Sequence, residues 1–378
     1  MKRIKSIDTF RGWCIFMMVL GHLLSWWIRP QDRWLTSVLH SIFGDIIGTG
    51  FLFFSGLSAV IFFRSRLSKV DASNEYCIDN INNEYLFRAL IIFILAMLYN
   101  SATAVGTLNP LNIWKWYIPL TIAISLFLSF FFLETSKSLR ILLAVNIWIA
   151  HYFILSILLP YQGRFHILGV LFHVLYNSMG LHPILYYFSF FLIGTVVGDI
   201  LFEIYLKDDQ NERRLALKNN FLIPSLIIGL SLILIAILFL FPGFLIHASF
   251  PSTIYSLGVL FTLFSVLLII EEFEIFKVKK SYRFFFFYSF YSFTIYFSHN
   301  ILYIIFLNQL NAFNFWIVFV GTIFLVTLLI KFAYKKYGAK LSLKAQIGRF
   351  ALILARKVEK KRIERLKYIH FNNKTYLD

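Results

Sequence analysis

Residues 5–28 read KSIDTFRGWCIFMMVLGHLLSWWI, and this stretch indicates a membrane helix. From Trp13 to Ile28 nearly every side chain is apolar, which is typical of a helix surrounded by hydrocarbon. The bulky continuation SWWIRPQDRW lacks the small residues of a signal-peptide cleavage site, so we expect the helix to be permanent. His22 lies near the middle of the run, where an imidazole is costly unless it has polar partners or a function.

The composition of the whole chain extends this interpretation. Of 378 residues, 59% are hydrophobic and only 15% are charged, whereas soluble domains are about 45–50% apolar and about 25% charged. Ten apolar runs are long enough to cross a bilayer: 12–28, 41–63, 86–105, 113–133, 141–159, 183–204, 221–241, 253–270, 284–307 and 313–331. The sequence therefore predicts an all-α, polytopic helix bundle with about ten transmembrane helices.

The distribution of the basic residues predicts the topology. The formal net charge is +17, from 36 Lys and Arg residues and 19 Asp and Glu residues. If the N-terminus is cytoplasmic, the basic residues outside the inner segments are Arg29, Arg33, Lys115 and Arg164. This asymmetry follows the positive-inside rule and predicts that both termini are cytoplasmic. The basic charge then needs no nucleic acid as a partner, and we expect a multi-pass protein of the cell membrane.

The pattern changes near residue 335. We expect residues 1–335 to form the transmembrane domain and residues 336–378 to form a basic cytoplasmic tail. Apolar residues recur at helical spacing between Lys and Arg in this tail, at Ile347, Phe350, Leu354 and Val358. The run is too short to span a membrane, so it predicts an amphipathic helix on the inner leaflet. Anionic lipid, attracting each cation by about 1 kcal/mol, is its expected partner.

Three ionisable residues from three different predicted spans are candidates to lie close together. Counting 1.5 Å per residue from the inner boundary, His22 lies roughly 15 Å deep and His299 roughly 20 Å deep. The span that contains Asp45 begins at the outer side, and Asp45 lies only about 6 Å below the outer boundary. We therefore expect these side chains to meet in the central to outer part of one bundle.

A polar cavity is favoured over a purely structural role for this group. A single buried histidine can simply fix helix packing. Further polar residues lie in or near the bundle, at Asn100, Asn146 and His151. This accumulation favours a cavity lined by His22, Asp45 and His299, the candidate catalytic residues. A metal centre is disfavoured, because the histidines form no H-x-x-x-H pair on one helix.

Asp8 and Arg11 mark the inner end of the first span. They are three residues apart at the start of a helix, so their side chains can form an ion pair. Alternatively, Arg11 offers a planar cation to a phosphate at the cytoplasmic mouth. We take both residues as candidates for binding a co-substrate.

Several stretches resemble a known family. RIKSIDTFRGWCIFMMVLGH (residues 3–22) resembles the opening of transmembrane acyltransferases related to heparan-α-glucosaminide N-acetyltransferase and the YeiB-like proteins. GDIIGTGFLFFSGLSAVIFFRSR (44–66), FSFFLIGTVVGDILF (188–202) and FYSFYSFTIYFSHNILYIIF (287–306) resemble later spans. In the animal lysosomal enzyme, the position matching His22 is similar to an asparagine, and the position of the proposed catalytic histidine is occupied here by Arg33. His22, His40 or neither could therefore be the base.

The resemblance implies acyl transfer across a membrane. We expect acetyl-CoA or another acyl-CoA as co-substrate without a metal, and an amine or hydroxyl of a sugar or glycolipid as acceptor at the outer side. His22 would act as general base or acyl receiver. A homo-oligomer is left open. The alternative is a solute transporter whose buried histidines line a polar cavity; inverted repeats and paired broken helices would support it.

Overall fold

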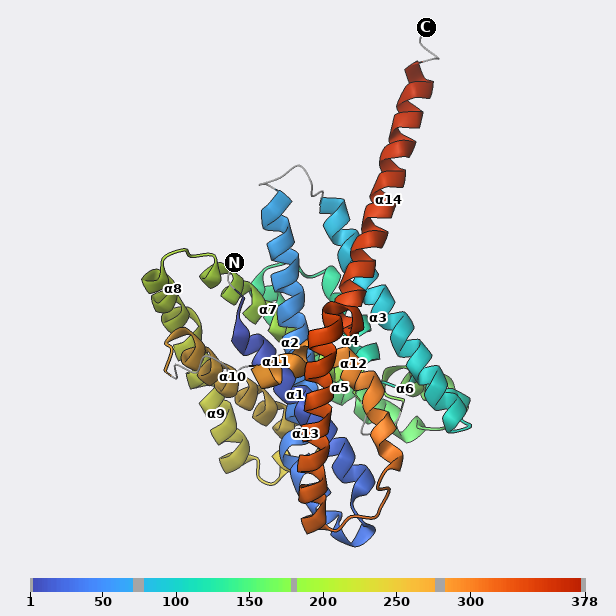
Figure 1. The fold of residues 1–378 in the computed structure, drawn as a ribbon, viewed down its shortest axis with the longest axis vertical. Helices are drawn as coiled ribbons and strands as arrows, with labels where there is room; N and C mark the ends of the chain where they lie inside the picture. Colours follow the sequence, from blue (N-terminus) through green and yellow to red (C-terminus); the bar gives the residue numbers. More distant parts are fainter. Residues whose placement is uncertain (1–2, 71–77, 178–181, 276–282, 375–378) are drawn as a thin grey trace.

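The computed structural model describes residues 3–70, 78–177, 182–275 and 283–374 and is an all-α bundle over these ranges (Figure 1). Its helices are α1 (Lys5–Trp27), α2 (Trp34–Val70), α3 (Ile78–Gly106), α4 (Ile118–Phe130), α5 (Lys137–Leu158), α6 (Ile167–Leu175), α7 (Ile184–Tyr205), α8 (Gln210–Leu217), α9 (Ile223–Phe239), α10 (Phe250–Glu272), α11 (Arg283–Phe290), α12 (Ser292–Ser298), α13 (Ala312–Tyr337) and α14 (Leu343–Lys374). In this part of the chain, eight helical segments are long and apolar enough to cross a membrane. The predicted polytopic helix bundle is confirmed.

Two of the ten predicted spans do not form one long helix. The predicted span 113–133 contains α4, which has only 13 residues. The predicted span 284–307 is divided into α11, α12 and a 3₁₀ segment over His299–Ile304. Such breaks place irregular backbone inside the bundle, where it is tolerated only next to protein or a cavity. His299, at this break, lines a cavity between the helices.

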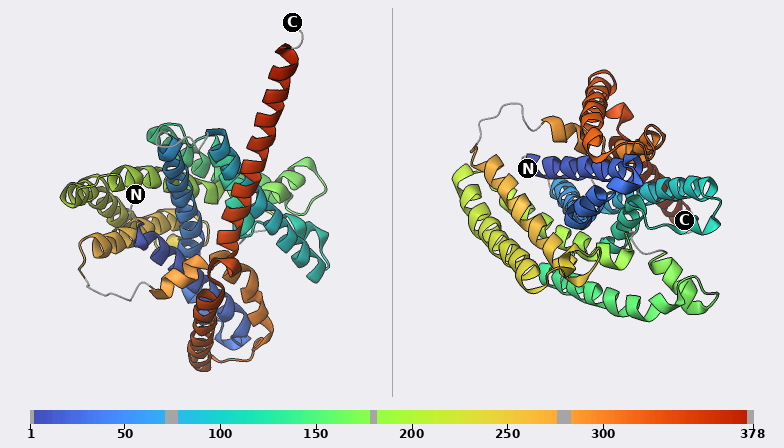
Figure 2. Two further views of the ribbon diagram at one scale, coloured as in Figure 1. Left: turned by 45° about the horizontal axis from the view of Figure 1, so that its top comes forward. Right: turned by 90° about the horizontal axis from the view of Figure 1, so that it is seen from below.

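Helices α2 and α7 form the centre of the bundle. They pack along each other, and α5 also packs against α7. Close approach is possible because glycines face the partner backbone: a Cβ on Gly194 would lie 2.0 Å from the carbonyl oxygen of Phe53. Seen from below in Figure 2 (right), the blue helices α1 and α2 lie centrally, with the yellow α9 and α10 on one side and the cyan α3 on the other.

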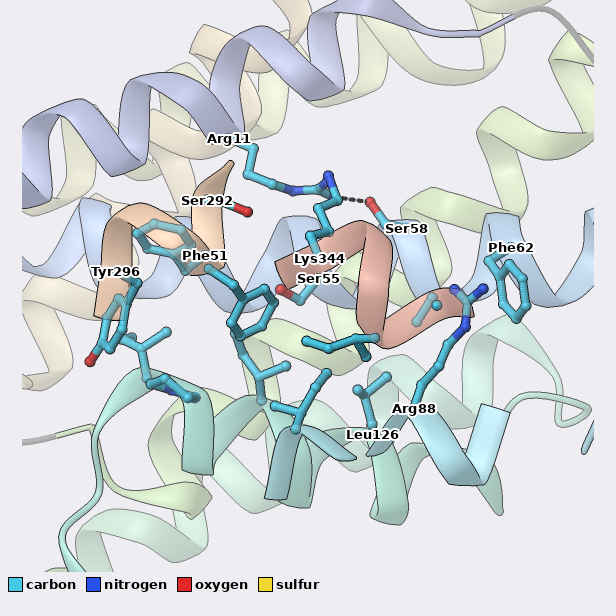
Figure 3. Close-up of a pocket in the computed structure, with 18 of the residues that line it drawn as sticks. Arg11, Phe51, Ser55, Ser58, Phe62, Arg88, Leu126, Ser292, Tyr296 and Lys344 are labelled. Atoms are coloured by element: carbon cyan, nitrogen blue, oxygen red, sulfur yellow. Dashed lines mark hydrogen bonds between the residues drawn. The ribbon is translucent and has the colours of Figure 1, made fainter. Parts of the chain in front are cut away.

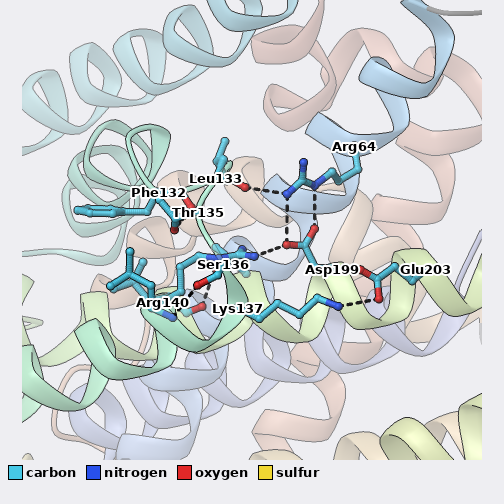
Figure 4. A network of polar contacts seen from close by, with 12 residues as sticks. Arg64, Phe132, Leu133, Thr135, Ser136, Lys137, Arg140, Asp199 and Glu203 are labelled. Carbon is cyan, nitrogen blue, oxygen red and sulfur yellow. Dashed lines mark hydrogen bonds and ion pairs between the residues drawn. The ribbon is translucent and has the colours of Figure 1, made fainter.

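A buried ion-pair network joins α2, α5 and α7 (Figure 4). Asp199 of α7 accepts from Arg64 of α2 at 2.9 Å and also from the fully buried Arg140 of α5. Arg64 donates a second hydrogen bond to the carbonyl oxygen of Leu133 at 2.8 Å. Buried charges are tolerated when they are paired and hydrogen-bonded in this way. Sequence analysis did not single out these residues, although Asp199 stands in an apolar run.

The tail is helical up to Lys374, and its first part is integrated into the bundle. Helix α14 packs against α3 and then extends away from the other helices (Figure 1). Ile347 is buried, as are Ala351 and Ala355 one and two turns later, whereas Phe350, Leu354 and Val358 are exposed. The apolar pattern therefore divides into a face on the protein and a face directed outward. Two expectations stay predictions: that the outward face binds the inner leaflet, and that the domain boundary lies at residue 335.

Candidate active site

An inner cavity of about 170 Å³ lies between the start of α1, the second half of α2, α3, α4 and α14. Its walls are largely apolar, but three cationic side chains line it: Arg11, Arg88 and Lys344. Figure 3 shows Tyr296 at one end and Arg88 with Phe62 at the other, with Arg11, Lys344 and Ser58 between them. The cavity is smaller than the roughly 300–1,000 Å³ of ordinary small-molecule sites. It therefore suits a narrow arm of a ligand better than a whole nucleotide.

The structure separates the two candidate co-substrate residues. Asp8 accepts two hydrogen bonds from Arg3, at 2.8 and 2.6 Å, and one from Ser289 at 3.0 Å. Arg11 instead donates to the hydroxyl of Ser58 and, at 3.2 Å, to the carbonyl oxygen of Phe54. Arg11 thus lines the cavity, whereas Asp8 is engaged by Arg3 beside it. Of the two readings of this pair, the geometry favours a guanidinium that is available to an anion.

An outer cavity of about 390 Å³ lies among the second half of α1, the first half of α2, α3, α4 and the 3₁₀ segment after α12. It is lined by five histidines, at His22, His40, His182, His247 and His299. Tyr99, Tyr117 and Asn300 add further polar groups, and Asn300 donates to the hydroxyl of Tyr99 at 2.6 Å. These groups can donate and accept hydrogen bonds and carry little fixed charge, which suits a polar, uncharged ligand such as a sugar.

His22 and His299 pack against each other in the wall of this cavity. Their ring centroids are 4.9 Å apart, and the ring of Trp26 stacks on both, at 5.1 Å from His22 and 5.6 Å from His299. His22 is exposed to the cavity although it lies well inside the span of α1, whereas His299 is only 5% exposed. The predicted meeting of these two helices is therefore present in the structure, while the catalytic role of either histidine stays a prediction.

The backbone defines the tautomer of His299. Its Nδ1 lies 2.5 Å from the carbonyl oxygen of Tyr296, which can only accept a hydrogen bond. Nδ1 must therefore carry the proton, and a neutral ring has its lone pair on Nε2. In the described part of the protein, no side chain or backbone group bonds this Nε2. His299 Nε2 is thus an acceptor atom without a bonding partner among the described residues, and it is buried in the wall of the cavity-lining element.

Asp45 does not join His22 and His299 as expected. Its carboxylate pairs with His247, which follows α9, and accepts a hydrogen bond from the backbone N–H of Ala248 at 2.9 Å. Asp45 is not among the cavity-lining residues, but its partner His247 is. The expectation that Asp45 joins His22 and His299 is therefore wrong. Residues about 200 positions later in the chain, His247 and Ala248, bind its carboxylate instead. Asp45 can orient His247, whose ring centroid lies 6.3 Å from that of His40.

The other intramembrane polar residues are distributed differently. Asn100 donates to the carbonyl oxygens of Ile113 and Lys115, at 3.0 and 2.8 Å, and fixes the loop before α4. Asn146 is exposed on α5, and its side-chain amide donates a hydrogen bond to the carbonyl oxygen of Leu142 on the same helix. His151 is buried among tyrosines near Tyr176 and Tyr186. None of the three lines either cavity.

His182 precedes α7 and contributes an imidazole that stays neutral. Burial, and to a smaller extent the nearby His247, lowers the pKa of His182 to about 3. At neutral pH this ring therefore acts as a hydrogen-bonding group without charge. In the described ranges no group of three or more His, Cys, Asp or Glu residues could hold a metal ion. The expectation of a metal-independent reaction is not tested by that finding.

The two cavities are adjacent. Phe51 of α2, Ile118 of α4 and Tyr296 of α12 line both of them. Sequence analysis missed this junction, because large apolar and aromatic side chains are common throughout such a bundle. It also missed Lys344, which lies in the basic tail. The sequence offered one indication of its position, a lysine on the same helix face as several small residues.

Comparison with known families agrees with this architecture. The family model described as heparan-alpha-glucosaminide N-acetyltransferase, catalytic, matches residues 3–233, which is more than half of the chain. No curated protein matches the chain at a significant level. The match includes Arg11, His22, His40 and Phe51, whereas α11 to α14 lie beyond it. This multi-pass membrane protein belongs to the heparan-alpha-glucosaminide N-acetyltransferase catalytic family.

Proposed function

We propose that the protein transfers an acyl group, normally acetyl, from cytoplasmic acyl-CoA to an amine or hydroxyl of a sugar or glycolipid at the outer side of the cell membrane. The observation that carries this proposal is the shared wall of the two cavities, formed by Phe51, Ile118 and Tyr296. A cationic cavity and a histidine-lined cavity meet there within one bundle. Membership of an acetyltransferase family supports the same reaction class.

The donor enters from the cationic side. Arg11 and His22 are eleven residues apart on α1, which corresponds to about 16 Å along the helix axis. An extended pantetheine arm can bridge this separation, with its phosphates near Arg11 and its thioester near the junction. The apolar lining of the inner cavity suits such an arm, which carries no charge along most of its length.

The acceptor binds on the histidine side and attacks the thioester carbonyl carbon. A neutral imidazole, at His22 or at His299 Nε2, takes the proton of the attacking amine or hydroxyl. The new bond joins the acyl carbon to the acceptor nitrogen or oxygen, the carbon–sulfur bond breaks, and the thiolate leaves. Trp26 and the tyrosines of the outer cavity offer ring faces against which a sugar can stack.

The direct test uses purified protein in detergent or nanodiscs with radiolabelled acetyl-CoA. Acceptors are offered as a panel of amino sugars, neutral sugars and glycolipids, and labelled product is separated from free donor. We expect label in at least one acceptor and a matching release of free CoA thiol. Absence of both transfer and donor hydrolysis over the whole panel would contradict the proposal.

A transporter remains the alternative, and one observation favours it. The segment after Phe290 is broken into α12 and a 3₁₀ turn at the cavity, and discontinuous helices of this kind form solute sites in transporters. Counterflow of a labelled sugar in proteoliposomes without any acyl donor separates the two functions. A transporter exchanges the sugar under these conditions, whereas an acyltransferase leaves it unmodified and outside.

A further inference from the structure

The first turn of α14 places a lysine in the inner cavity. Lys344 lines it together with Arg11, and Figure 3 shows the two side chains converging beside Ser58. Within the proposed function, we propose that Lys344 and Arg11 together bind the phosphates of the acyl-CoA donor. Helix α14, which lies outside the family match, would then complete a site that otherwise belongs to the matched region.

The charges around the cavity support an anion at this position. Arg88 is paired with Glu84 at 2.7 Å, and Arg3 is paired with Asp8. Within the described ranges, Arg11 and Lys344 form no ion pair within 4 Å, although the Asp8 carboxylate lies close enough to attract both, and the Lys344 ammonium donates to the carbonyl oxygen of Ser289 at 3.4 Å. Two cations that share a partly buried cavity repel each other, and an anion between them removes that cost. Asp8 lies nearby but already accepts from Arg3 and Ser289.

The remaining polar groups on this wall also suit a phosphate. The hydroxyls of Ser55, Ser58 and Ser292 line the cavity beside the two cations. Hydroxyls and a planar guanidinium can all donate to phosphate oxygens, while a lysine ammonium adds a mobile point charge. The apolar lining toward Tyr296 then accommodates an uncharged arm. An anionic head followed by an apolar arm is the chemistry of an acyl-CoA.

The position of Lys344 is fixed from two sides. At the start of α14, the backbone N–H of Leu343 donates to the hydroxyl of Thr294 at 3.0 Å, and the hydroxyl of Ser342 donates to the carbonyl oxygen of Phe290 at 2.6 Å. Further along, Ala351 and Ala355 are fully buried where α14 packs against α3. The tail helix is therefore held on the bundle, and its lysine is held in the cavity.

The test compares donors with and without phosphates. Transfer from acetyl-CoA and from S-acetylpantetheine, which lacks phosphates, is measured for the wild type, Lys344→Met and Lys344→Arg. Lys340→Met is the matched control, because this exposed lysine lies one turn earlier and does not line the cavity. For Lys344→Met we expect KM for acetyl-CoA to rise about 10-fold, as for loss of one charged hydrogen bond, with kcat little changed.

With S-acetylpantetheine as donor, Lys344→Met and the wild type should transfer the acetyl group at the same rate. Lys344→Arg should recover most of the affinity for acetyl-CoA, and Lys340→Met should match the wild type with both donors. An equal loss with both donors, or no loss with either, would overturn the role of Lys344. Thermal stability of each purified variant, measured in parallel, shows whether the fold is retained, and Lys344→Arg keeps the proposal testable if Lys344→Met does not fold.

Binding of tritiated CoA gives a readout that needs no acceptor and no turnover. If CoA binds and Lys344→Met weakens it about 10-fold while no acceptor is acylated, the proposed function fails and the phosphate site stands. If acyl transfer occurs but Lys344→Met binds CoA normally, the phosphate site fails and the proposed function stands. The two proposals are therefore tested separately.

Discussion

The two cavities share walls from α1 to α4 but carry different chemistry. On α1, Arg11 lines the inner cavity and His22 the outer one; on α2, Ser58 lines the inner cavity and His40 the outer one. Among the described lining residues, Arg and Lys side chains are thus confined to the inner cavity and imidazoles to the outer one. The division follows position along the helix axis, so one pair of helices can serve an anionic donor and an uncharged acceptor.

The largest expected effect comes from the outer cavity. His22→Ala should lower transfer by roughly 10²–10⁴-fold, as is typical when a general base is removed. Binding of labelled CoA should change little, because His22 does not line the inner cavity. Initial rates at saturating donor, measured together with CoA affinity, check both expectations. His22→Asn tests the residue type associated with the animal enzyme.

A matched control for this experiment is His166→Asn. His166 caps α6 by accepting from the backbone N–H of Leu168, and asparagine preserves a capping acceptor. This variant should retain wild-type turnover. If both His22 variants also turn over normally, His22 is a packing residue. His299, with its oriented Nε2, then becomes the better candidate for the base.

The comparison also shows what the sequence could predict. Depth counted along helices is a local property, so the approach of His22 to His299 followed from two spans read separately. The pairing of Asp45 with His247 did not, because it depends on where the segment between α9 and α10 folds. A local sequence pattern cannot predict a contact between residues so far apart in the chain, because packing determines the conformation of the segment between α9 and α10.

The tail illustrates a second limit of the sequence. Helical spacing identified its helix, and large residues suggested Ile347, Phe350, Leu354 and Val358 as its apolar face. The protein instead buries Ala351 and Ala355 together with Ile347. Small side chains carry a weak hydropathy signal but permit close helix packing. The sequence thus predicts a lipid surface for the tail as a whole and gives no sign that its Lys344 lines the inner cavity.

The junction between the cavities should control the length of the acyl group. Phe51 is 6% exposed and lines both cavities, so its ring limits the space for a chain beyond the thioester carbon. Phe51→Leu should raise the ratio of butyryl to acetyl transfer by at least about 10-fold, because accommodating one additional methylene in an apolar pocket is worth about 1–3 kcal/mol. Rates with butyryl-CoA and acetyl-CoA measure this ratio.

The matched control is Phe54→Leu on the same helix. Phe54 is fully buried and lines neither cavity, so its replacement tests the general effect of a smaller core side chain. We expect the acyl ratio to stay at the wild-type value. The same change in ratio for both variants would mean that loosened packing, rather than space at the junction, allows the longer chain.

An effect of about the same size is expected for Arg11, and its dependence on salt sharpens the contrast between the cavities. Arg11→Ala should raise KM for acetyl-CoA by about 10-fold, the loss of a charged hydrogen bond, while kcat at saturating donor changes less. High salt should reduce this difference, because it screens the attraction between a cation and phosphate even in the wild type. His22→Ala should show no such salt dependence, since a neutral imidazole makes no Coulombic contact. Unchanged donor affinity in a folded Arg11→Ala protein would limit Arg11 to its bonds with Ser58 and Phe54, which hold α1 against α2.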